Sequence, residues 1–175
     1  MITFESARTW CIRAHGNQKY ARVLPYSVHL DAAAEVALRF GITRPAILLA
    51  ILGHDVVEDT KKRIWDFWLA GFPLASCLMI WLVTDKAGAT REERKRKTLP
   101  WIALSRDAVL VKLCDRIANV EFSIRNKEKK FARHVAEYAF FRACLYNPAH
   151  KQALAMWHHL DDLIYVAGSS SAKVA

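Results

Sequence analysis

The sequence is poor in the residues that interrupt regular structure. It holds six glycines and five prolines in 175 positions, whereas 53% of its residues are hydrophobic. This composition excludes collagen-like and disordered chains, and it disfavours β-rich folds that need many turns. The length also fits one domain, because domains run to roughly 100–200 residues. We therefore predict a single-domain, all-α protein.

The four cysteines are not arranged in pairs. Cys11, Cys77, Cys114 and Cys144 form no CxxC motif and stand among apolar residues, as expected for small buried side chains in a reducing compartment. This arrangement argues against a disulfide framework and against a zinc ribbon. The first residues, MITFESARTW, also lack the basic start and apolar run of a secretory signal. We therefore expect a cytoplasmic protein.

One apolar stretch is long enough to need an explanation. Residues 67–84 carry no charge over 18 positions, which is the lower limit for a membrane-spanning helix. Gly71 and Pro73 interrupt the stretch, and each part is shorter than the roughly 20 residues that a span needs. We therefore expect two buried helices and no membrane partner.

Helical periodicity covers most of the chain. Apolar residues recur every three to four positions, and Gly41, Thr43 and Pro45 mark a helix end and the next helix start. The pattern predicts helices over residues 3–15, 26–40, 45–59, 61–70, 73–84, 107–124, 128–146 and 149–167. Residues 1–168 would form the domain, and residues 169–175, which lack large anchoring side chains, a disordered tail. We expect most of the six tryptophans in the core.

Polar residues gather at the end of the otherwise apolar helix predicted from Pro45. The run His54-Asp55-Val56-Val57-Glu58-Asp59 holds three carboxylates and one imidazole. On a helix, His54 and Glu58 would lie one turn apart, with Asp55 and Asp59 on the neighbouring line. Like charges so close together repel unless a cation or a shared proton neutralises them. The cluster therefore indicates a divalent metal site, although an exposed acidic helix end remains an alternative.

Two other places offer further metal ligands. His29 stands in the first turn of the preceding predicted helix, and Asp115 and Asn119 stand one turn apart on a later one. Each is weak by itself, because a lone histidine is often structural and Asp115 can pair with the adjacent Arg116. In combination with the acidic cluster, they favour one shared site.

In this order the residues resemble a known family. The set His29, His54-Asp55, Asp115 resembles the H…HD…D signature of HD-domain metal-dependent phosphohydrolases. The segments AHGNQKYARVLPYSVH, LGHDVVEDT, LVTDK with a following EERK, and VKLCDRIAN resemble the (p)ppGpp hydrolase domain of RelA/SpoT enzymes, whose stand-alone form is the small alarmone hydrolase. The resemblance covers residues 4–145. It implies an all-α HD-domain bundle that removes the 3′-diphosphate from guanosine tetra- or pentaphosphate to give GDP or GTP.

The resemblance also implies roles for individual residues. It implies a Mn²⁺ cofactor, with other divalent ions possible, held by His29, His54, Asp55 and Asp115. Glu58 and Asp59 match the family's catalytic acidic pair.

Substrate contacts follow from the same resemblance. Asn119 matches an asparagine near the ribose, Arg91 a basic residue on the phosphates, and Tyr138 a tyrosine that lines the pocket. The formal net charge of +9 fits a polyanionic partner. Most of the excess lies in two segments, residues 86–97 and 125–133, each with a net charge of +4. We therefore expect a small-molecule nucleotide substrate.

The chain departs from the family where an arginine usually packs on the guanine base. Tyr20 stands there, followed two positions later by Arg22. An aromatic ring can also stack on a purine, and Arg22 can replace part of the arginine's role. Guanine preference therefore stays open, and an HD-domain nucleotidase or phosphatase acting on an adenine alarmone or another nucleotide is the second interpretation.

A third interpretation is non-enzymatic. In it, the basic helices bind nucleic acid or a partner protein and the histidines and carboxylates are structural. We disfavour it, because a pure binding module does not need six polar residues at metal-site spacing. The oligomeric state, and the choice between general stress control and an antitoxin role, are not determined by the sequence.

Overall fold

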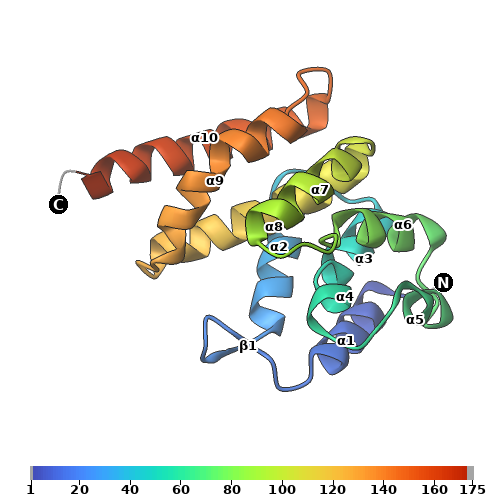
Figure 1. Ribbon diagram of the computed structural model, residues 1–175. Coiled ribbons are helices and arrows are strands. Elements are labelled where there is room, and N and C mark those ends of the chain that lie inside the picture. Colours follow the sequence, from blue (N-terminus) through green and yellow to red (C-terminus); the bar gives the residue numbers. More distant parts are fainter. Residues whose placement is uncertain (1, 173–175) are drawn as a thin grey trace.

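The computed structural model describes the backbone of residues 2–172 and the side chains as far as Val166. This part of the chain forms ten helices and one two-stranded hairpin (Figure 1). In chain order the elements are α1 (Phe4–His15), β1 (Lys19–Tyr20), β2 (Leu24–Pro25), α2 (Ser27–Arg39), α3 (Pro45–Gly53), α4 (Val56–Asp59), α5 (Ile64–Leu69), α6 (Leu74–Val83), α7 (Arg91–Ala103), α8 (Arg106–Arg125), α9 (Lys130–Leu145) and α10 (Lys151–Ala172). The predicted all-α fold is confirmed.

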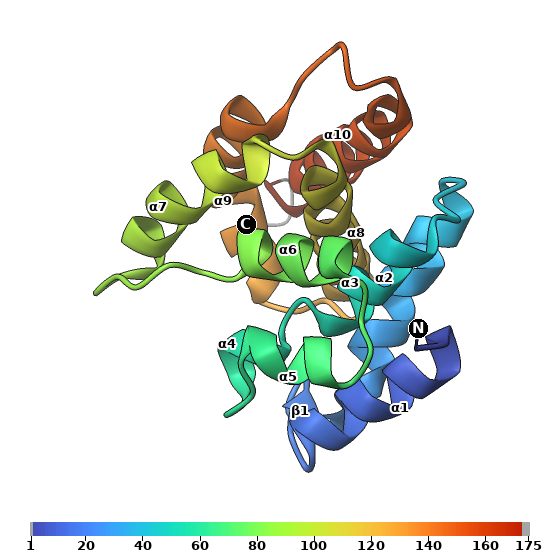
Figure 2. The ribbon, with the colours of Figure 1, turned by 90° about the vertical axis from the view of Figure 1, so that its right-hand side faces the viewer.

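Helix α8 forms the centre of the molecule. It is buried along most of its length, and α2, α3, α6, α7, α9 and α10 all pack against it. Helices α9 and α10 lie on one side of α8, and α1, α4 and α5 lie on the other (Figure 1). The view in Figure 2 shows the same division, with α7 beside α9. Polar residues on α8 are consequently enclosed by elements from both ends of the chain.

The helix predicted over residues 45–59 is two helices. Helix α3 ends at Gly53, and α4 begins at Val56 after a turn formed by His54 and Asp55. A Cβ on Gly53 would lie 2.6 Å from Phe67 Cε1 and 2.7 Å from Ile80 Cδ1. Glycine therefore lets α5 and α6 approach the backbone directly beside His54. The break places His54 and Asp55 at a helix junction instead of on one continuous helix.

Helix α7 was not predicted, because its first half is almost entirely charged and carries little apolar periodicity. A start signal was nevertheless present in the sequence. Thr90 caps the helix by accepting a hydrogen bond from the Glu93 amide at 3.1 Å, and Glu93 Oε2 accepts one from the Ala89 amide at 2.7 Å. A threonine followed three residues later by a glutamate is the sequence pattern of a capping box, although Glu93 here accepts from the residue before the cap.

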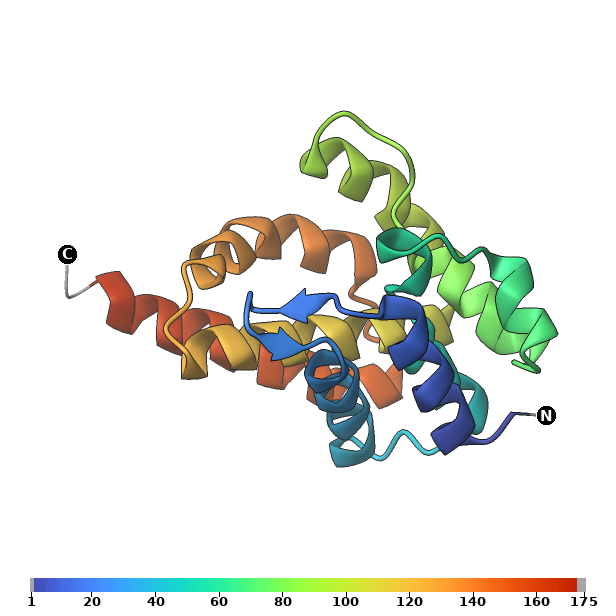
Figure 3. The same ribbon diagram turned by 90° about the horizontal axis from the view of Figure 1, so that it is seen from below.

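The loop expected before Pro25 contains a short hairpin. Tyr20 of β1 pairs with Leu24 of β2, and the turn between them holds Ala21 and Arg22 at positive φ values of 48° and 73°. Figure 3 shows this hairpin lying along α8. The contact is made by the Tyr20 ring, which packs edge-on against Phe122 of α8 with centroids 4.7 Å apart.

Two further expectations need correction. Helix α10 continues to Ala172, through most of the segment expected to be a tail, and residues 173–175 of that segment lie outside the described part. Four tryptophans are exposed instead of lying in the core: Trp65, Trp68, Trp81 and Trp101. They stand on the outward faces of α5, α6 and α7, which the core does not reach. Across the described residues, no helix combines the length and apolar character needed to cross a membrane.

Candidate metal centre

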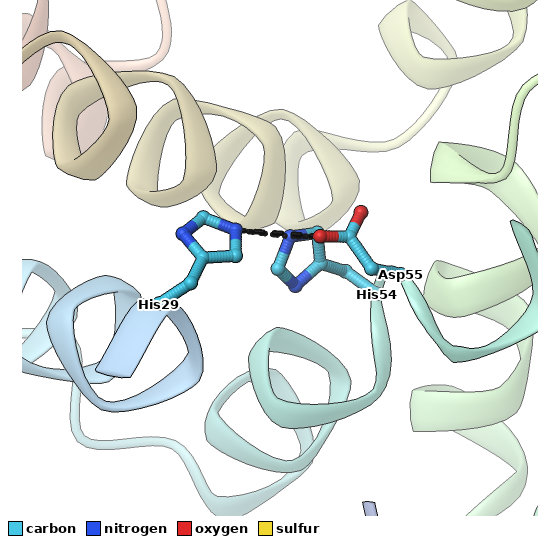
Figure 4. Close-up of side chains that lie close together, drawn as sticks. All are labelled: His29, His54 and Asp55. Carbon is cyan, nitrogen blue, oxygen red and sulfur yellow. Dashed lines mark hydrogen bonds and ion pairs between the residues drawn. The ribbon is translucent and has the colours of Figure 1, made fainter. Parts of the chain in front are cut away.

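Three side chains from two parts of the chain converge below α8. His29 lies in the first turn of α2, whereas His54 and Asp55 form the junction between α3 and α4 (Figure 4). The Nε2 atoms of the two histidines are 3.2 Å apart. Asp55 Oδ2 lies 3.3 Å from His29 Nε2 and 3.0 Å from His54 Nε2. These atoms form a group that can hold a metal ion.

Asp115 of α8 completes the group. Its Oδ1 lies 3.4 Å from His29 Nε2 and 3.5 Å from His54 Nε2. Ligand atoms at about 2.1 Å from one cation in octahedral geometry lie about 3.0 Å from each other. The observed separations are close to this value. The structure therefore brings together the four side chains that the sequence predicts as ligands.

The hydrogen bonds of His54 suit a metal ligand. His54 Nδ1 lies 2.7 Å from the Ile51 carbonyl oxygen, which can only accept, so Nδ1 donates. In the neutral ring the lone pair is then on Nε2, the atom that faces the cluster. Carbonyl-bound imidazoles of this kind are common metal ligands because the bond fixes both ring orientation and tautomer.

Opposite charges shift the pKa values of all four side chains in the cluster. Burial alone would lower the pKa of both imidazoles, but the carboxylates of Asp55 and Asp115 raise it above the ordinary value. Burial would likewise raise the pKa of each carboxyl, but His54 holds the pKa of Asp55, and Lys112 together with the histidines that of Asp115, well below the usual value. A cation bound here would also favour the ionised carboxylates.

Two residues that support the cluster were missed by the sequence analysis. The buried Lys112 donates from Nζ to Asp115 Oδ2 at 2.7 Å, and the Tyr26 hydroxyl donates to Asp55 Oδ2. Burial opposes the charge on Lys112, but the neighbouring Asp115, Glu58 and Asp55 raise the pKa of its ammonium group. Lys112 stands three residues before Asp115 in the motif KLCD, so its i, i+3 spacing on a helix was the available signal.

The cluster opens into a cavity of about 370 Å³. One end of the cavity is acidic and holds His29, Asp55, Asp115, Glu58 and Asp59. Lys112 stands at the same end, beside Asp115. A cationic wall is formed by Arg91, Lys95, Arg116, Lys130 and Arg133, and uncharged residues such as Tyr20, Asn119 and His134 complete the lining. A ligand with several negative charges and one group for the metal would match both ends.

Glu58 and Asp59 are held on different sides of the acidic end. Glu58 Oε1 accepts a hydrogen bond from the Asp85 amide at 2.8 Å, and Asp59 Oδ2 accepts one from Gln18 Nε2 at 2.8 Å. Loss of water and the nearby carboxylates of Asp55 and Asp85 raise the pKa of Glu58, although Lys112 opposes this effect. The two carboxylates thus both stand on α4, but they are held by different segments, Glu58 by the segment after α6 and Asp59 by the segment after α1.

Tyr20 belongs to the wall behind the metal cluster. Its ring stacks on His29 with centroids 5.0 Å apart and planes at 19°, and its hydroxyl donates to Asn119 Oδ1 at 3.2 Å. Asn119 in turn donates to Asp115 Oδ1 at 2.6 Å. Tyr20 also lines the cavity, although only 7% of its surface is exposed, so its contact with the purine stays a prediction.

The remaining predicted substrate contacts divide into two groups. Arg91 lines the cavity and donates to Glu137 Oε1 at 2.5 Å. Arg22 is exposed in the hairpin turn, and Tyr138 points away from the cavity toward α10, where its hydroxyl donates to Asp161. Neither Arg22 nor Tyr138 is among the residues that line the cavity, so their contact with the substrate stays a prediction.

Comparisons with known proteins were made for sequence and for structure. No protein-family model matches the chain. It is 31% identical over 142 residues to a GTP pyrophosphokinase of Streptomyces coelicolor, an alignment that covers 77% of this chain and 16% of that protein. It is 34% identical over 98 residues to guanosine-3′,5′-bis(diphosphate) 3′-pyrophosphohydrolase MESH1 of Drosophila melanogaster, covering 55% of this chain and 54% of that protein.

A solved structure extends the similarity to the whole fold. It is described as a metazoan orthologue of SpoT that hydrolyses ppGpp and plays a role in starvation responses, and it superposes with a TM-score of 0.77 over 94% of this chain and 95% of its own. The chain is thus similar in sequence to parts of both curated relatives. At 23% identity the superposition shows a shared fold. The sequence alignments reach at most about half of each relative's length.

Proposed function

We propose that the chain is a metal-dependent hydrolase that removes the 3′-diphosphate from guanosine tetra- or pentaphosphate, giving GDP or GTP and pyrophosphate. The observation that carries the proposal is the convergence of two imidazoles and two carboxylates at the acidic end of a cationic cavity. The name of the Drosophila relative, guanosine-3′,5′-bis(diphosphate) 3′-pyrophosphohydrolase, describes this reaction. The small-molecule partner would be the nucleotide itself.

His29, His54, Asp55 and Asp115 would hold the metal, and we propose Mn²⁺. Two imidazole nitrogens together with hard carboxylate oxygens suit manganese, iron or zinc. A bound divalent cation would polarise the attacked phosphate and acidify water. The chain's part is to hold the four ligands at fixed positions, which the Ile51 carbonyl does for His54, Tyr26 for Asp55 and Lys112 for Asp115.

Glu58 and Asp59 would handle the proton of the attacking water. Both carboxylates face the acidic end of the cavity, and each is anchored through one oxygen, which leaves the second free for water. A carboxylate within hydrogen-bonding reach can orient the water and accept its proton. Since burial raises the pKa of Glu58, Glu58 takes up a proton more readily than an exposed glutamate would.

The cationic wall would hold the phosphates. Arg91 and Lys95 come from α7, and Lys130 and Arg133 come from the neighbouring α9. Cations fixed in advance stabilise the charge that develops on the departing pyrophosphate. We also propose a cytoplasmic site of action, supported by the four free cysteines and a nucleotide substrate.

The test compares manganese-loaded and metal-stripped protein on guanosine and adenosine alarmones, with the products identified. Release of pyrophosphate that depends on manganese supports the proposed reaction. The ratio of guanosine to adenosine turnover then measures the base preference. Release of orthophosphate, or no turnover by protein with verified metal content, would contradict the proposal and favour another phosphorylated nucleotide.

A further inference from the structure

His134 lies in the cationic wall of the cavity, on the second turn of α9. It lines the cavity, only 5% of its surface is exposed, and none of the contacts described above involves it. Its Nδ1 is 2.9 Å from Arg116 Nη1. Because a guanidinium has donors and no acceptor, Nδ1 must accept this hydrogen bond. The single proton of the neutral ring is therefore on Nε2.

Arg116, which fixes the ring of His134, is itself held by two contacts. Arg116 Nη1 also donates to Glu137 Oε2 at 3.2 Å, and the guanidinium carbon lies 4.6 Å from the Phe141 ring centroid. Glu137 in turn binds Arg91. The network ties α7, α8 and α9 together around the cavity. This network holds the His134 ring in one orientation.

The Nε2–H group of His134 has no acceptor in the described part of the chain, and the atom is buried. Leaving a buried donor without an acceptor costs free energy, so native proteins rarely do it without a reason. Three other buried ring nitrogens also lack a partner there: His15 Nε2, His29 Nδ1 and Trp157 Nε1. Neither His15 nor Trp157 lines the cavity, and His29 turns its other nitrogen, Nε2, to the metal cluster. His134 is the one of the four that stands in the cationic wall.

We infer that His134 is a substrate-positioning residue that donates its Nε2 hydrogen to a phosphate oxygen of the bound nucleotide. The inference rests on the proposed function for the identity of the ligand. The neighbouring groups of the wall, Arg91, Arg116, Lys130 and Arg133, are all donors, and both oxygens of Glu137 are already engaged by arginines. An oxygen that only accepts and carries negative charge, as in a phosphate, suits this environment better than a hydroxyl.

The donor carries no charge. Burial, together with Arg116 and Arg133, lowers the pKa of His134 to about 4, so the ring is neutral near neutral pH. Salt screens the attraction of a charged side chain for phosphate but leaves a neutral, enclosed hydrogen bond almost unchanged. The contribution of His134 to binding should therefore be independent of salt, unlike that of Lys130.

Two substitutions separate the donor from the contact with Arg116. In His134→Asn the side-chain oxygen can occupy the Nδ1 position and accept from Arg116, but nothing reaches the Nε2 position. In His134→Gln the amide nitrogen reaches the Nε2 position and can donate. Binding of GDP to the metal-loaded proteins is measured by calorimetry, with metal content and thermal unfolding checked for each variant.

We expect His134→Asn to raise the Kd for GDP about tenfold and His134→Gln to raise it less than about threefold. The Kd of His134→Asn divided by the Kd of wild type should be the same at about 50 mM and about 500 mM salt. The corresponding ratio for Lys130→Met should be smaller at the higher salt. In turnover, His134→Asn should raise KM with kcat unchanged.

Three results would overturn the inference: a His134→Asn variant that binds GDP as wild type does, a His134→Gln variant that binds no better than His134→Asn, or wild-type protein that does not bind GDP. The proposed function fails separately. Wild-type protein that binds GDP through His134 but turns over no alarmone would contradict the function and keep this inference. If wild type hydrolyses the alarmone and His134→Asn binds GDP as wild type does, the proposed function stands and the inference about His134 fails.

Discussion

Replacing Lys112 by methionine tests how the charges of the metal cluster are balanced. Lys112 donates to Asp115 at 2.7 Å, and the two side chains are only 8% and 12% exposed. The Lys112→Met side chain keeps most of the volume but removes the lysine that forms an ion pair with Asp115. Asp115 would then remain buried beside Asp55 and Glu58 without that compensation.

The expected cost is large for one side chain. Removing one partner of a buried ion pair costs about 3–5 kcal/mol, and a domain of this size loses about 2–4 °C of Tm for each kcal/mol. In chelator we therefore expect Tm to fall by about 6–20 °C. With Mn²⁺ bound, the cation neutralises Asp115 in place of Lys112, so the loss should drop below about 2 kcal/mol.

The assay is urea and thermal unfolding of wild type, Lys112→Met and the exposed control Lys151→Met, each in chelator and in Mn²⁺. The control should stay within about 0.5 kcal/mol of wild type in both conditions. A loss below about 1 kcal/mol in chelator would show that Lys112 does not balance Asp115. An equal loss with and without manganese would show that Asp115 is not a metal ligand.

Further substitutions and conditions test the remaining parts of the site. Asp59→Asn should keep the hydrogen bond from Gln18, the fold and the metal content, but lose about 100-fold or more in kcat in the pyrophosphate-release assay; an active variant would contradict its catalytic role. His54→Ala should lose the metal in elemental analysis of the purified protein, and a variant with full metal content would remove His54 from the ligand set. Gly53→Ala should destabilise by about 1–3 kcal/mol in urea unfolding, because its Cβ would lie 2.6 Å from the Phe67 ring; wild-type stability would show that Phe67 can move. His134 has a pKa of about 4 in the fold against an ordinary value of 6.5. Below pH 6.5 the unfolded chain therefore binds a proton that the folded chain does not, and stability is lost as pH falls from 6.5 toward 4. The free energy of unfolding should therefore drop by about 3 kcal/mol more in wild type than in His134→Asn across this window, and equal slopes would refute the shift.

Local patterns predicted most helices correctly. Apolar periodicity and end signals such as Thr43 and Pro45 depend only on neighbouring residues, so the positions of α1, α2, α6, α8 and α9 agree closely with the structure. Helix α7 was missed because its charged first half carries no apolar stripe, and its capping by Thr90 and Glu93 was the weaker signal. The β1–β2 hairpin was missed because Ala21 and Arg22 occupy the turn without a glycine.

The candidate ligands were predictable for a different reason. Grouped carboxylates and imidazoles are costly unless a cation compensates them, so the composition of the run from His54 to Asp59 already indicates a metal. Whether His29 and Asp115 join that run depends on α2 and α8 packing together, and only the structure places their atoms within 3.5 Å of the His54 Nε2. The substrate contacts were less predictable, since Tyr138 faces α10 instead of the cavity.

The sequence by itself determined the helical class, the acidic cluster and the basic excess, because each of these is a property of residue types and short spacing. Tertiary structure alone decided which charges meet. It paired Lys112 with Asp115, turned Tyr20 onto His29, and left His134 with an unused donor in the wall of the cavity. These contacts depend on the angles at which distant helices pack around α8, and such angles follow from the whole core instead of any local pattern.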